Sequence, residues 1–323
     1  MTKGGNEAMR TFNKFMRIGL VVCLGICIGL PYCNGVSAQD KRSDPIELTF
    51  SVVPEELGAM SAVMYEPFIK YIAQKTGKKV AFYMTTSYAA EVEAMISGFV
   101  DIASFGPAAY VLAVRRDPNI EVFAVKNTKP GVIRKGGPGF NGCLITKKGG
   151  KYDTIEILRG ATLALTDPAS TSGYFLPKVI FAEEILKGEP LEKYFGKIVW
   201  TGQHDAAMLA VQEGRADAAF TNDGNMESAI AAGLVKKEWY NYLWWSKTVP
   251  TDPWAFRKNL KPEIKEKIKE AFYTFKPGQV EGADKFWASY IGIEFLPQTD
   301  ATYDVIRKLV DAKEKMDKEK PKK

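Results

Sequence analysis

Asp167-Pro168-Ala169-Ser170-Thr171-Ser172-Gly173-Tyr174 follows an apolar run that predicts a strand over 162–165 and leads into a predicted helix over 172–187. Three consecutive hydroxyl residues therefore fall at the N-terminus of a helix. Such a terminus presents unpaired backbone N–H groups and the positive end of the helix dipole. With no Lys or Arg close by in the sequence, hydroxyls and amides together predict a neutral cradle for a small oxyanion. The alternative is that Ser170 or Thr171 only caps the helix.

The first 38 residues predict a cleaved secretory signal peptide. A basic segment precedes an apolar run over 18–30, which is shorter than a membrane span. Val36-Ser37-Ala38 then places small residues before Gln39, where we expect cleavage. The alternative is a lipoprotein acylated on Cys33, although the residues before that cysteine are bulkier than such a site requires. Either way, the mature protein is expected in the periplasm.

Composition argues against several classes of protein. Cys143 is the one cysteine that follows the predicted signal, so neither an internal disulfide nor a multi-cysteine zinc site is expected. The net charge of the whole sequence is +6, and no basic face with interleaved aromatic residues predicts nucleic-acid binding. No later segment reaches the roughly 18 continuous apolar residues of a membrane span. We expect no metal and no cofactor.

Strand-like and helix-like segments alternate along the mature chain. A connection rich in Gly, Pro and Lys over 129–139 separates two series of such segments. The predicted strands are 48–53, 80–84, 101–105, 120–125, 143–146, 162–165, 198–200, 216–220 and 242–246. This alternation is typical of α/β lobes with mostly parallel sheets covered on both faces.

Polar side chains follow the ends of several of these strands, where ligands of open α/β sheets bind. His204 is the only histidine in the sequence and opens a predicted helix. It is either a ligand contact or an ordinary hydrogen-bonded residue, and it lacks the His or Cys company that a metal needs. Ser172, His204 and Asp252 are also the residue types of a nucleophile triad. Because no Gly-x-Ser-x-Gly elbow is present, hydrolase activity is not favoured.

Several motifs in this order resemble the periplasmic phosphonate- and phosphite-binding proteins of ABC transporters. They are Asp167-Pro168-x-Ser170-Thr171-Ser172-Gly173, Gly202-Gln203-His204-Asp205-Ala206, Val249-Pro250-x-Asp252-Pro253, Tyr88 and Phe105-Gly106-Pro107-Ala108-Ala109-Tyr110. The resemblance covers about 46–290 and implies an α/β, two-lobed type II periplasmic-binding-protein fold. Each lobe would be a mixed, mostly parallel sheet flanked by helices, and a two-strand hinge would join the lobes. Lobe 1 would comprise 39–142 and 246–323, lobe 2 would comprise 143–245, and the ligand would bind between them.

The resemblance also implies roles for the candidate residues. Ser170, Thr171 and Ser172 resemble the cradle for the phosphorus oxygens, and Tyr88 and Tyr110 resemble hydroxyl donors from the first lobe. His204 resembles a histidine that hydrogen-bonds an oxygen. Asp252 resembles a carboxylate that accepts a hydrogen bond from the protonated oxyanion.

Two positions depart from the family pattern. Aminoalkylphosphonate binders carry a glutamate near 222–225, where this chain has Asn222-Asp223-Gly224-Asn225. Unless Asp223 substitutes, this favours a small oxyanion such as phosphite, methylphosphonate or phosphate. Cys143 stands on the predicted first crossover strand, where the family often has Ser. It is either a small buried apolar residue or a thiol for a thiophilic ligand such as arsenite.

The resulting hypothesis is a non-catalytic, monomeric binding protein that closes around a phosphorus oxyanion and delivers it to a membrane permease. The alternative is an oxyanion sensor that presents its ligand to the ectodomain of a histidine kinase.

Overall fold

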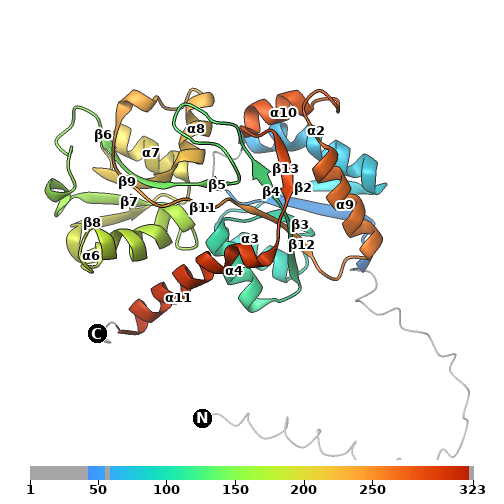
Figure 1. The fold of residues 1–323 in the computed structure, drawn as a ribbon, viewed down its shortest axis with the longest axis horizontal. Helices are drawn as coiled ribbons and strands as arrows, with labels where there is room; N and C mark the ends of the chain where they lie inside the picture. The colour runs from blue at the N-terminus through green and yellow to red at the C-terminus, as the bar shows by residue number, and fades with distance from the viewer. Residues whose placement is uncertain (1–42, 55–58, 320–323) are drawn as a thin grey trace, which may run out of the picture. The chain divides into compact units, whose positions relative to one another are not determined.

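The computed structural model describes residues 43–54 and 59–319. The predicted signal peptide (1–38), its cleavage site before Gln39 and the alternative acylation site at Cys33 lie outside these residues. Within them, the strands form two mixed sheets and a short ribbon, surrounded by helices (Figure 1). The α/β architecture expected from the sequence is confirmed. None of the described helices is both long enough and apolar enough to cross a membrane.

The first sheet has six strands in the order β13-β4-β12-β3-β1-β2. Its strands are β1 (Glu47–Val52), β2 (Lys79–Met84), β3 (Ile102–Ser104), β4 (Ile120–Asn127), β12 (Pro253–Arg257) and β13 (Glu294–Pro297). Its helices are α2 (Ala59–Thr76), α3 (Tyr88–Ile96), α4 (Pro107–Arg116), α9 (Pro262–Thr274) and α10 (Ala283–Tyr290). We call this sheet and these helices the first half.

The second sheet has five strands in the order β10-β6-β9-β7-β8. Its strands are β6 (Gly142–Lys147), β7 (Thr162–Leu165), β8 (Lys197–Trp200), β9 (Ala218–Asn222) and β10 (Tyr240–Trp245). Its helices are η1 (Glu156–Leu158), η2 (Thr171–Phe175), η3 (Pro177–Phe181), α5 (Ala182–Glu184), α6 (Leu191–Tyr194), α7 (His204–Gln212), α8 (Asp223–Ala231) and η4 (Lys237–Trp239). We call this sheet and these helices the second half.

The direction of each strand follows from how the chain reaches it. Strands joined through helices are parallel, namely β2-β1-β3 in the first sheet and β8-β7-β9 in the second. The strands next to the crossings between the halves are antiparallel to their neighbours. These are β12 against β3 and β4, and β6 against β9 and β10.

A two-stranded ribbon joins the halves. Strand β5 (Gly139–Phe140) pairs antiparallel with β11 (Val249–Pro250), and the chain passes between the sheets at both strands. A Cβ on Gly139 would lie 2.7 Å from Thr248 Cγ2 and 2.9 Å from the Val249 carbonyl oxygen. Glycine therefore allows the two crossing segments to approach closely.

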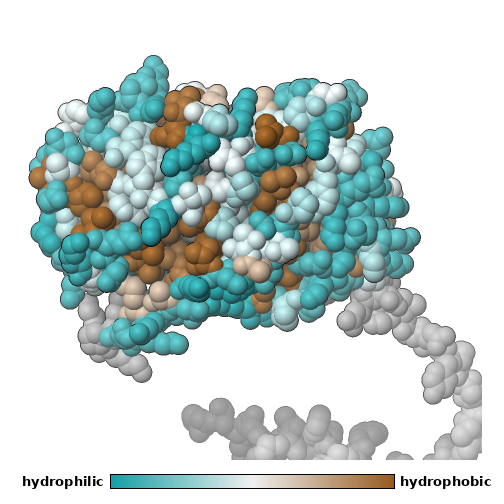
Figure 2. Space-filling view, in the orientation of Figure 1, coloured by the Kyte–Doolittle hydropathy of each residue, from teal (hydrophilic) through white to brown (hydrophobic). Residues whose placement is uncertain are grey.

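The C-terminal helix α11 (Asp304–Glu319) follows the short turn η5 (Asp300–Tyr303) and contacts both halves. On the first half, the Arg115 guanidinium lies 2.5 Å from the Asp311 carboxylate. On the second half, Lys313 Nζ lies 5.7 Å from the centre of the Tyr174 ring. Figure 1 shows α11 extending from the first half toward the second, and Figure 2 shows its hydrophilic outer face below a hydrophobic patch.

An aromatic cluster forms the core of the first half. Phe50 stacks on Trp254 with ring centres 4.9 Å apart, and Trp254 meets Phe272 at 5.2 Å. Phe68 stacks on Phe295 at 5.0 Å. Because aromatic rings bury much apolar surface and add specific edge and face contacts, this cluster fixes the strand ends that carry the site.

The predicted helix over 172–187 is wider and more broken than expected. The Phe175 N–H donates to the Ser170 carbonyl, five residues back, and the Leu176 N–H donates to the Thr171 carbonyl. These are π-helical turns, which are rare and are found frequently at functional sites. Pro177 lies inside the segment and has no N–H for a regular α-helical bond.

Two strands of the first sheet were not predicted. Strand β12 is buried at every position, so it lacks the alternation that marks a half-exposed strand. It also begins with Pro253, and proline is uncommon in strands inside a sheet except at their first residue. Strand β13 has four residues and ends at Pro297 on the sheet edge, a position that tolerates proline.

A buried carboxyl joins helix α3 to the ends of two strands. Glu91 Oε2 accepts hydrogen bonds from Ser51 Oγ at 2.7 Å and from Thr85 Oγ1 at 2.9 Å. Burial raises the pKa of Glu91 to about 7, while the two hydroxyl donors oppose that change. The folded protein therefore holds this proton more tightly than the unfolded chain does.

We predict that Glu91→Gln removes a pH-dependent part of the stability. The contribution of protonated Glu91 is complete below the unfolded pKa of 4.5 and is lost as the pH rises through the folded pKa of about 7. Relative to Glu91→Gln, the parent should lose about 3 kcal/mol of unfolding free energy between acidic and mildly alkaline pH. Urea unfolding across that range measures the change. Glu93→Gln, at an exposed position on the same helix, is the control and should not remove it. A parent and a Glu91→Gln variant with parallel pH profiles would contradict the assignment.

Candidate functional site

The three hydroxyl residues of the predicted cradle lie together and are almost fully buried. Ser170 Oγ accepts from the Gly173 N–H at 3.1 Å, and Thr171 Oγ1 accepts from the Ala108 N–H at 2.9 Å. Ser172 Oγ accepts from Asn222 Nδ2 at 2.9 Å. A hydroxyl has one donor and two acceptor positions, so each retains an O–H that can donate to an anion. Capping thus explains Ser170 but neither of its neighbours.

The loop that carries the cradle meets the N-termini of two helices from the first half. Ala108 lies in the first turn of α4, and its N–H is the one that reaches Thr171. Tyr88 is the first residue of α3, and its backbone N–H donates to the Asp167 carboxylate. Asp167 also accepts from the Ala169 N–H at 2.7 Å. The positive ends of two helix dipoles therefore face this loop, which favours negative charge there.

The Tyr88 side chain is buried beside the start of α4. A Cβ on Gly106 would lie 3.1 Å from the Tyr88 ring, so this glycine leaves the space that the ring occupies. The structure therefore brings Tyr88 to the loop of the cradle, as the sequence predicts.

His204 lies against the cradle as a neutral imidazole. Its Nε2 lies 3.5 Å from Ser170 Oγ, at the long limit of a hydrogen bond, and its Nδ1 lies 3.1 Å from Thr221 Oγ1. Burial lowers the pKa of His204 to about 3. At neutral pH the ring is therefore uncharged and has one donor and one acceptor nitrogen.

A cavity of about 60 Å³ is lined by residues of both halves, and Asn222 connects its wall to the cradle. Asn222 lines it and donates to Ser172. Other polar residues on its walls are Ser104, Lys126, Arg134, Asn225 and Asp252. A cavity needs about 10–15 Å³ to hold one water molecule, so this cavity has room for a few small groups.

Asp252 follows the ribbon strand β11 and lines this cavity. Burial of the carboxylate raises the pKa of Asp252 to about 6, and the charges of Lys126 and Arg134 oppose that change. The Tyr303 hydroxyl donates to the carbonyl of the preceding residue, Thr251, at 2.9 Å and holds the chain at this point. At neutral pH, Asp252 is mostly ionised and can accept a hydrogen bond.

The side chains do not form a nucleophile triad. The serine that contacts His204 is Ser170, while Ser172 is hydrogen-bonded to Asn222. The other ring nitrogen of His204 meets the Thr221 hydroxyl, where a triad would have a carboxylate. Asp252 instead lines the cavity between the halves.

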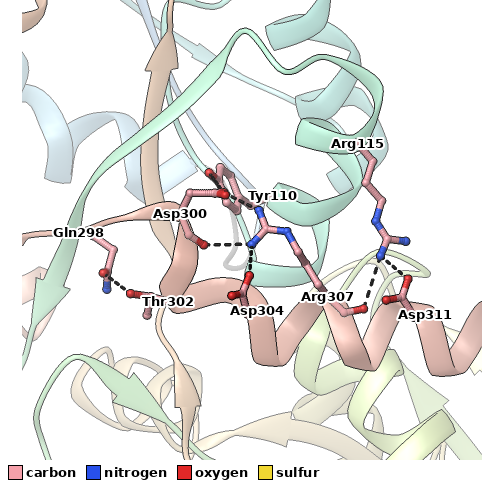
Figure 3. A network of polar contacts seen from close by, with 8 residues as sticks. All are labelled: Tyr110, Arg115, Gln298, Asp300, Thr302, Asp304, Arg307 and Asp311. Atoms are coloured by element: carbon pink, nitrogen blue, oxygen red, sulfur yellow. Dashed lines mark hydrogen bonds and ion pairs between the residues drawn. The ribbon is translucent and has the colours of Figure 1, made fainter.

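Tyr110 lies away from the other predicted site residues. Its hydroxyl donates to Asp300 Oδ1 at 2.7 Å, and its ring packs on Tyr303 with centres 5.1 Å apart. Arg307 Nη2 lies 2.5 Å from the same Asp300 oxygen (Figure 3). Tyr110 therefore ties α4 to the start of α11. Its partner lies 190 positions further along the chain, so no local pattern could have indicated this role.

Asn225, Arg134 and Lys126 line the cavity and were missed by the sequence analysis. Asn225 N–H donates to Asn222 Oδ1 at 2.8 Å in the first turn of α8. Arg134 lies in the Gly-, Pro- and Lys-rich connection, whose composition indicated only a linker. Cys143, in contrast, is fully buried in β6 and is not among the residues that line the cavity. Burial raises the pKa of its thiol well above the usual value.

Comparisons with known proteins agree with this geometry. Residues 50–303 match a family model described as "ABC transporter, phosphonate, periplasmic substrate-binding protein". The chain is 31% identical to the phosphate-import protein PhnD of Mycolicibacterium smegmatis, over 88% of this chain and 93% of that protein. It is 29% identical to the phosphonates-binding periplasmic protein of Escherichia coli, over 71% of this chain and 66% of that protein. The crystal structure of a binding protein component of an ABC phosphonate transporter from Pseudomonas aeruginosa superimposes with a TM-score of 0.75, at 28% identity, covering 84% of this chain and 87% of that one.

We predict that the ring nitrogens of His204 keep the ¹⁵N chemical shifts of a neutral imidazole from about pH 8 down to about pH 4. The reason is the burial that lowers the pKa of His204 to about 3. Because the sequence contains one histidine, a tag-free sample gives an unambiguous signal. The protein in urea is the control and should titrate near about pH 6.5. A native midpoint close to that of the unfolded protein would show that the imidazole is solvated.

Proposed function

The chain belongs to the family of periplasmic substrate-binding proteins of phosphonate ABC transporters, and we propose that it binds a small phosphorus oxyanion beside its hydroxyl cradle and delivers it to the membrane permease. The ligand class comprises phosphite, small phosphonates and phosphate. The observation that carries the proposal is the cradle itself. Each of its three hydroxyls already accepts a hydrogen bond and retains a proton to donate, and two helix N-termini face the same loop.

Recognition in the cradle relies on hydrogen bonds rather than on ion pairs. His204 is neutral because burial lowers its pKa. A buried oxyanion that accepts several O–H and N–H bonds gains about 1.5–3 kcal/mol from each of them. We therefore assign Ser170, Thr171, Ser172, Tyr88 and His204 to the anion. Tyr110 is assigned to the contact between α4 and α11 instead.

The size of the cavity supports a small ligand. A space of about 60 Å³ next to the cradle accommodates a proton, a methyl group or another short substituent on phosphorus. The names of the two relatives, a phosphate-import protein and a phosphonates-binding protein, point to the same class. Asp223 does not provide the amine-binding acid, because its carboxylate accepts from the Asn141 N–H at 3.0 Å and from the Gly224 N–H.

Closure brings the site together. The bonds from Ala108 to Thr171 and from Tyr88 to Asp167 connect the two halves, while β5 and β11 form the covalent crossing. Rotation about this ribbon would separate the cradle from the helix N-termini, as in hinge closure around a ligand. A ligand that touches both sides stabilises the closed arrangement. The boundaries proposed for the two lobes remain 39–142 with 246–323, and 143–245.

Other parts of the hypothesis concern export and partners. We propose that the mature chain begins at Gln39 in the periplasm and acts as a monomer. A kinase-linked sensor would use the same ligand site, so the site geometry favours neither partner. Cys143 lies outside the walls of the cavity, and no thiophilic ligand is proposed.

We predict that Thr171→Val and Ser172→Ala each weaken the binding of phosphite, methylphosphonate or phosphate by about 1–3 kcal/mol, the cost of leaving a buried acceptor without a donor. Isothermal titration calorimetry against this panel measures the loss. Ser97→Ala, which removes an exposed hydroxyl in the first half, is the control and should bind like the parent. If both cradle variants also bind like the parent, the anion lies elsewhere.

We predict that Asp252 selects oxyanions that carry an acidic proton. An ionised carboxylate accepts a short hydrogen bond from P–OH but repels a fully ionised anion such as sulfate. Because burial raises the pKa of Asp252 to about 6, sulfate affinity should rise as the pH falls through that value. Asp252→Asn should bind sulfate equally at all these pH values and should bind the protonated phosphorus anion several-fold more weakly. A variant that keeps the parent's preference would show that Asp252 is not the discriminator.

A further inference from the structure

Arg134 is a buried cation on the wall of the inter-half cavity. Its side chain belongs to the connection between β4 and β5, and 5% of the residue's surface is exposed. The guanidinium lines the cavity together with Asn225 and Asp252. The cradle does not involve this residue, so the cavity has a positively charged wall next to a neutral anion site.

Most of the hydrogen-bonding capacity of this guanidinium is not used within the described part of the chain. Nη2 donates to the Gly139 carbonyl at 2.9 Å and approaches the Gly137 carbonyl at 3.5 Å. The buried Nε–H has no partner there, and the carboxylates of Asp223, Asp252 and Glu227 act on the guanidinium only through space. A guanidinium has five N–H donors. A buried charge with unmade hydrogen bonds is costly, and a bound anion would remove that cost.

The acidic residues around Arg134 do not fill this role. Glu227 accepts from the Val132 and Ile133 N–H groups at 2.8 and 2.9 Å. Asp223 is held by backbone N–H groups of its own surroundings. Both residues and Asp252 favour the charged form of Arg134 through space, while burial lowers its pKa.

Gly224 leaves the space next to Arg134 Nη1 unfilled. A Cβ on Gly224 would lie 3.1 Å from Arg134 Nη1 and 3.2 Å from Asn222 Oδ1. An acidic side chain at this position would extend toward the guanidinium and could pair with it. With glycine, the Nη1 side of the cation remains accessible from the cavity. Lys126, which donates to the Tyr290 carbonyl at 3.1 Å, adds a second positive charge to the cavity wall.

We propose that Arg134 is a specificity-determining residue that binds a carboxylate on the substituent of the phosphonate, so that the preferred ligands are short phosphonocarboxylates. The inference rests on the proposed function and deepens it. A carboxylate is planar and matches the two-pronged geometry of a guanidinium edge. It is also small enough for a cavity of about 60 Å³. An ammonium group in the same place would face the charge of Arg134.

Calorimetry with three probes tests this assignment: phosphonoacetate, methylphosphonate and 2-aminoethylphosphonate. The parent should bind phosphonoacetate at least about tenfold more tightly than methylphosphonate, and 2-aminoethylphosphonate most weakly. Arg134→Gln should lose about tenfold to hundredfold in phosphonoacetate affinity, the range for a charge-assisted bond. Its methylphosphonate affinity should stay within about threefold of the parent. Arg159→Gln, which removes an exposed arginine paired with Glu189, is the control and should change neither affinity.

A second variant covers the case in which Arg134→Gln does not fold. Gly224→Ala narrows the space in front of Nη1 without removing the charge, so it should weaken phosphonoacetate more than methylphosphonate. Equal losses for all three probes would place the phosphorus group itself on Arg134 and overturn the inference. A parent that binds methylphosphonate as tightly as phosphonoacetate would overturn it while leaving the proposed function intact. A parent that binds no phosphorus anion at all, including phosphite and phosphate, would overturn both.

Discussion

Two hydrogen bonds from backbone amides of the first half to side chains of the second half determine how the site is assembled. The Ala108 N–H reaches Thr171, and the Tyr88 N–H reaches Asp167. Each amide lies at the start of a helix, so neither has a partner within its own helix. The loop after β7 supplies the side-chain acceptors for these amides. The same contacts place its hydroxyls at the positive ends of two helix dipoles. The contact between the halves therefore places the cradle hydroxyls and brings them into the electrostatic field of the two helix N-termini.

The site combines two environments that differ in charge. The cradle is neutral, because His204 is buried and uncharged and the donors are hydroxyls and amides. The adjoining cavity carries Lys126, Arg134 and Asp252. Under the proposed function, the neutral cradle would hold the oxyanion without demanding a particular total charge, and the charged cavity would distinguish the group attached to phosphorus. Asn222 connects the two, since it lines the cavity and donates to Ser172.

The sequence predicted those features that depend on neighbours along the chain. Alternating segments indicated the α/β architecture, and three hydroxyls at a helix start indicated the cradle, because both arise from local backbone geometry. Features that depend on distant partners were missed. Tyr110 stands two residues beyond Ala108, yet its hydroxyl donates to Asp300 and its ring packs on Tyr303, both in η5. Arg134 lies in a segment with no periodicity, and its position at the cavity depends on Gly139 in the ribbon and on Glu227, which holds the neighbouring backbone. The π-helical turns after Ser170 were also missed, because hydrophobic periodicity does not distinguish i→i−5 from i→i−4 hydrogen bonds.

The strand order of the first sheet has a consequence for the order in which the protein folds. Strand β12 lies between β3 and β4, although the whole second half separates it from them in the chain. During synthesis from the N-terminus, the first sheet is therefore divided until Pro253–Arg257 has been made. The second sheet has all its strands within 142–245 and no such gap. The half that is translated later is thus the first to be topologically complete, and the earlier half waits with exposed strand edges, a state that favours chaperone binding and aggregation.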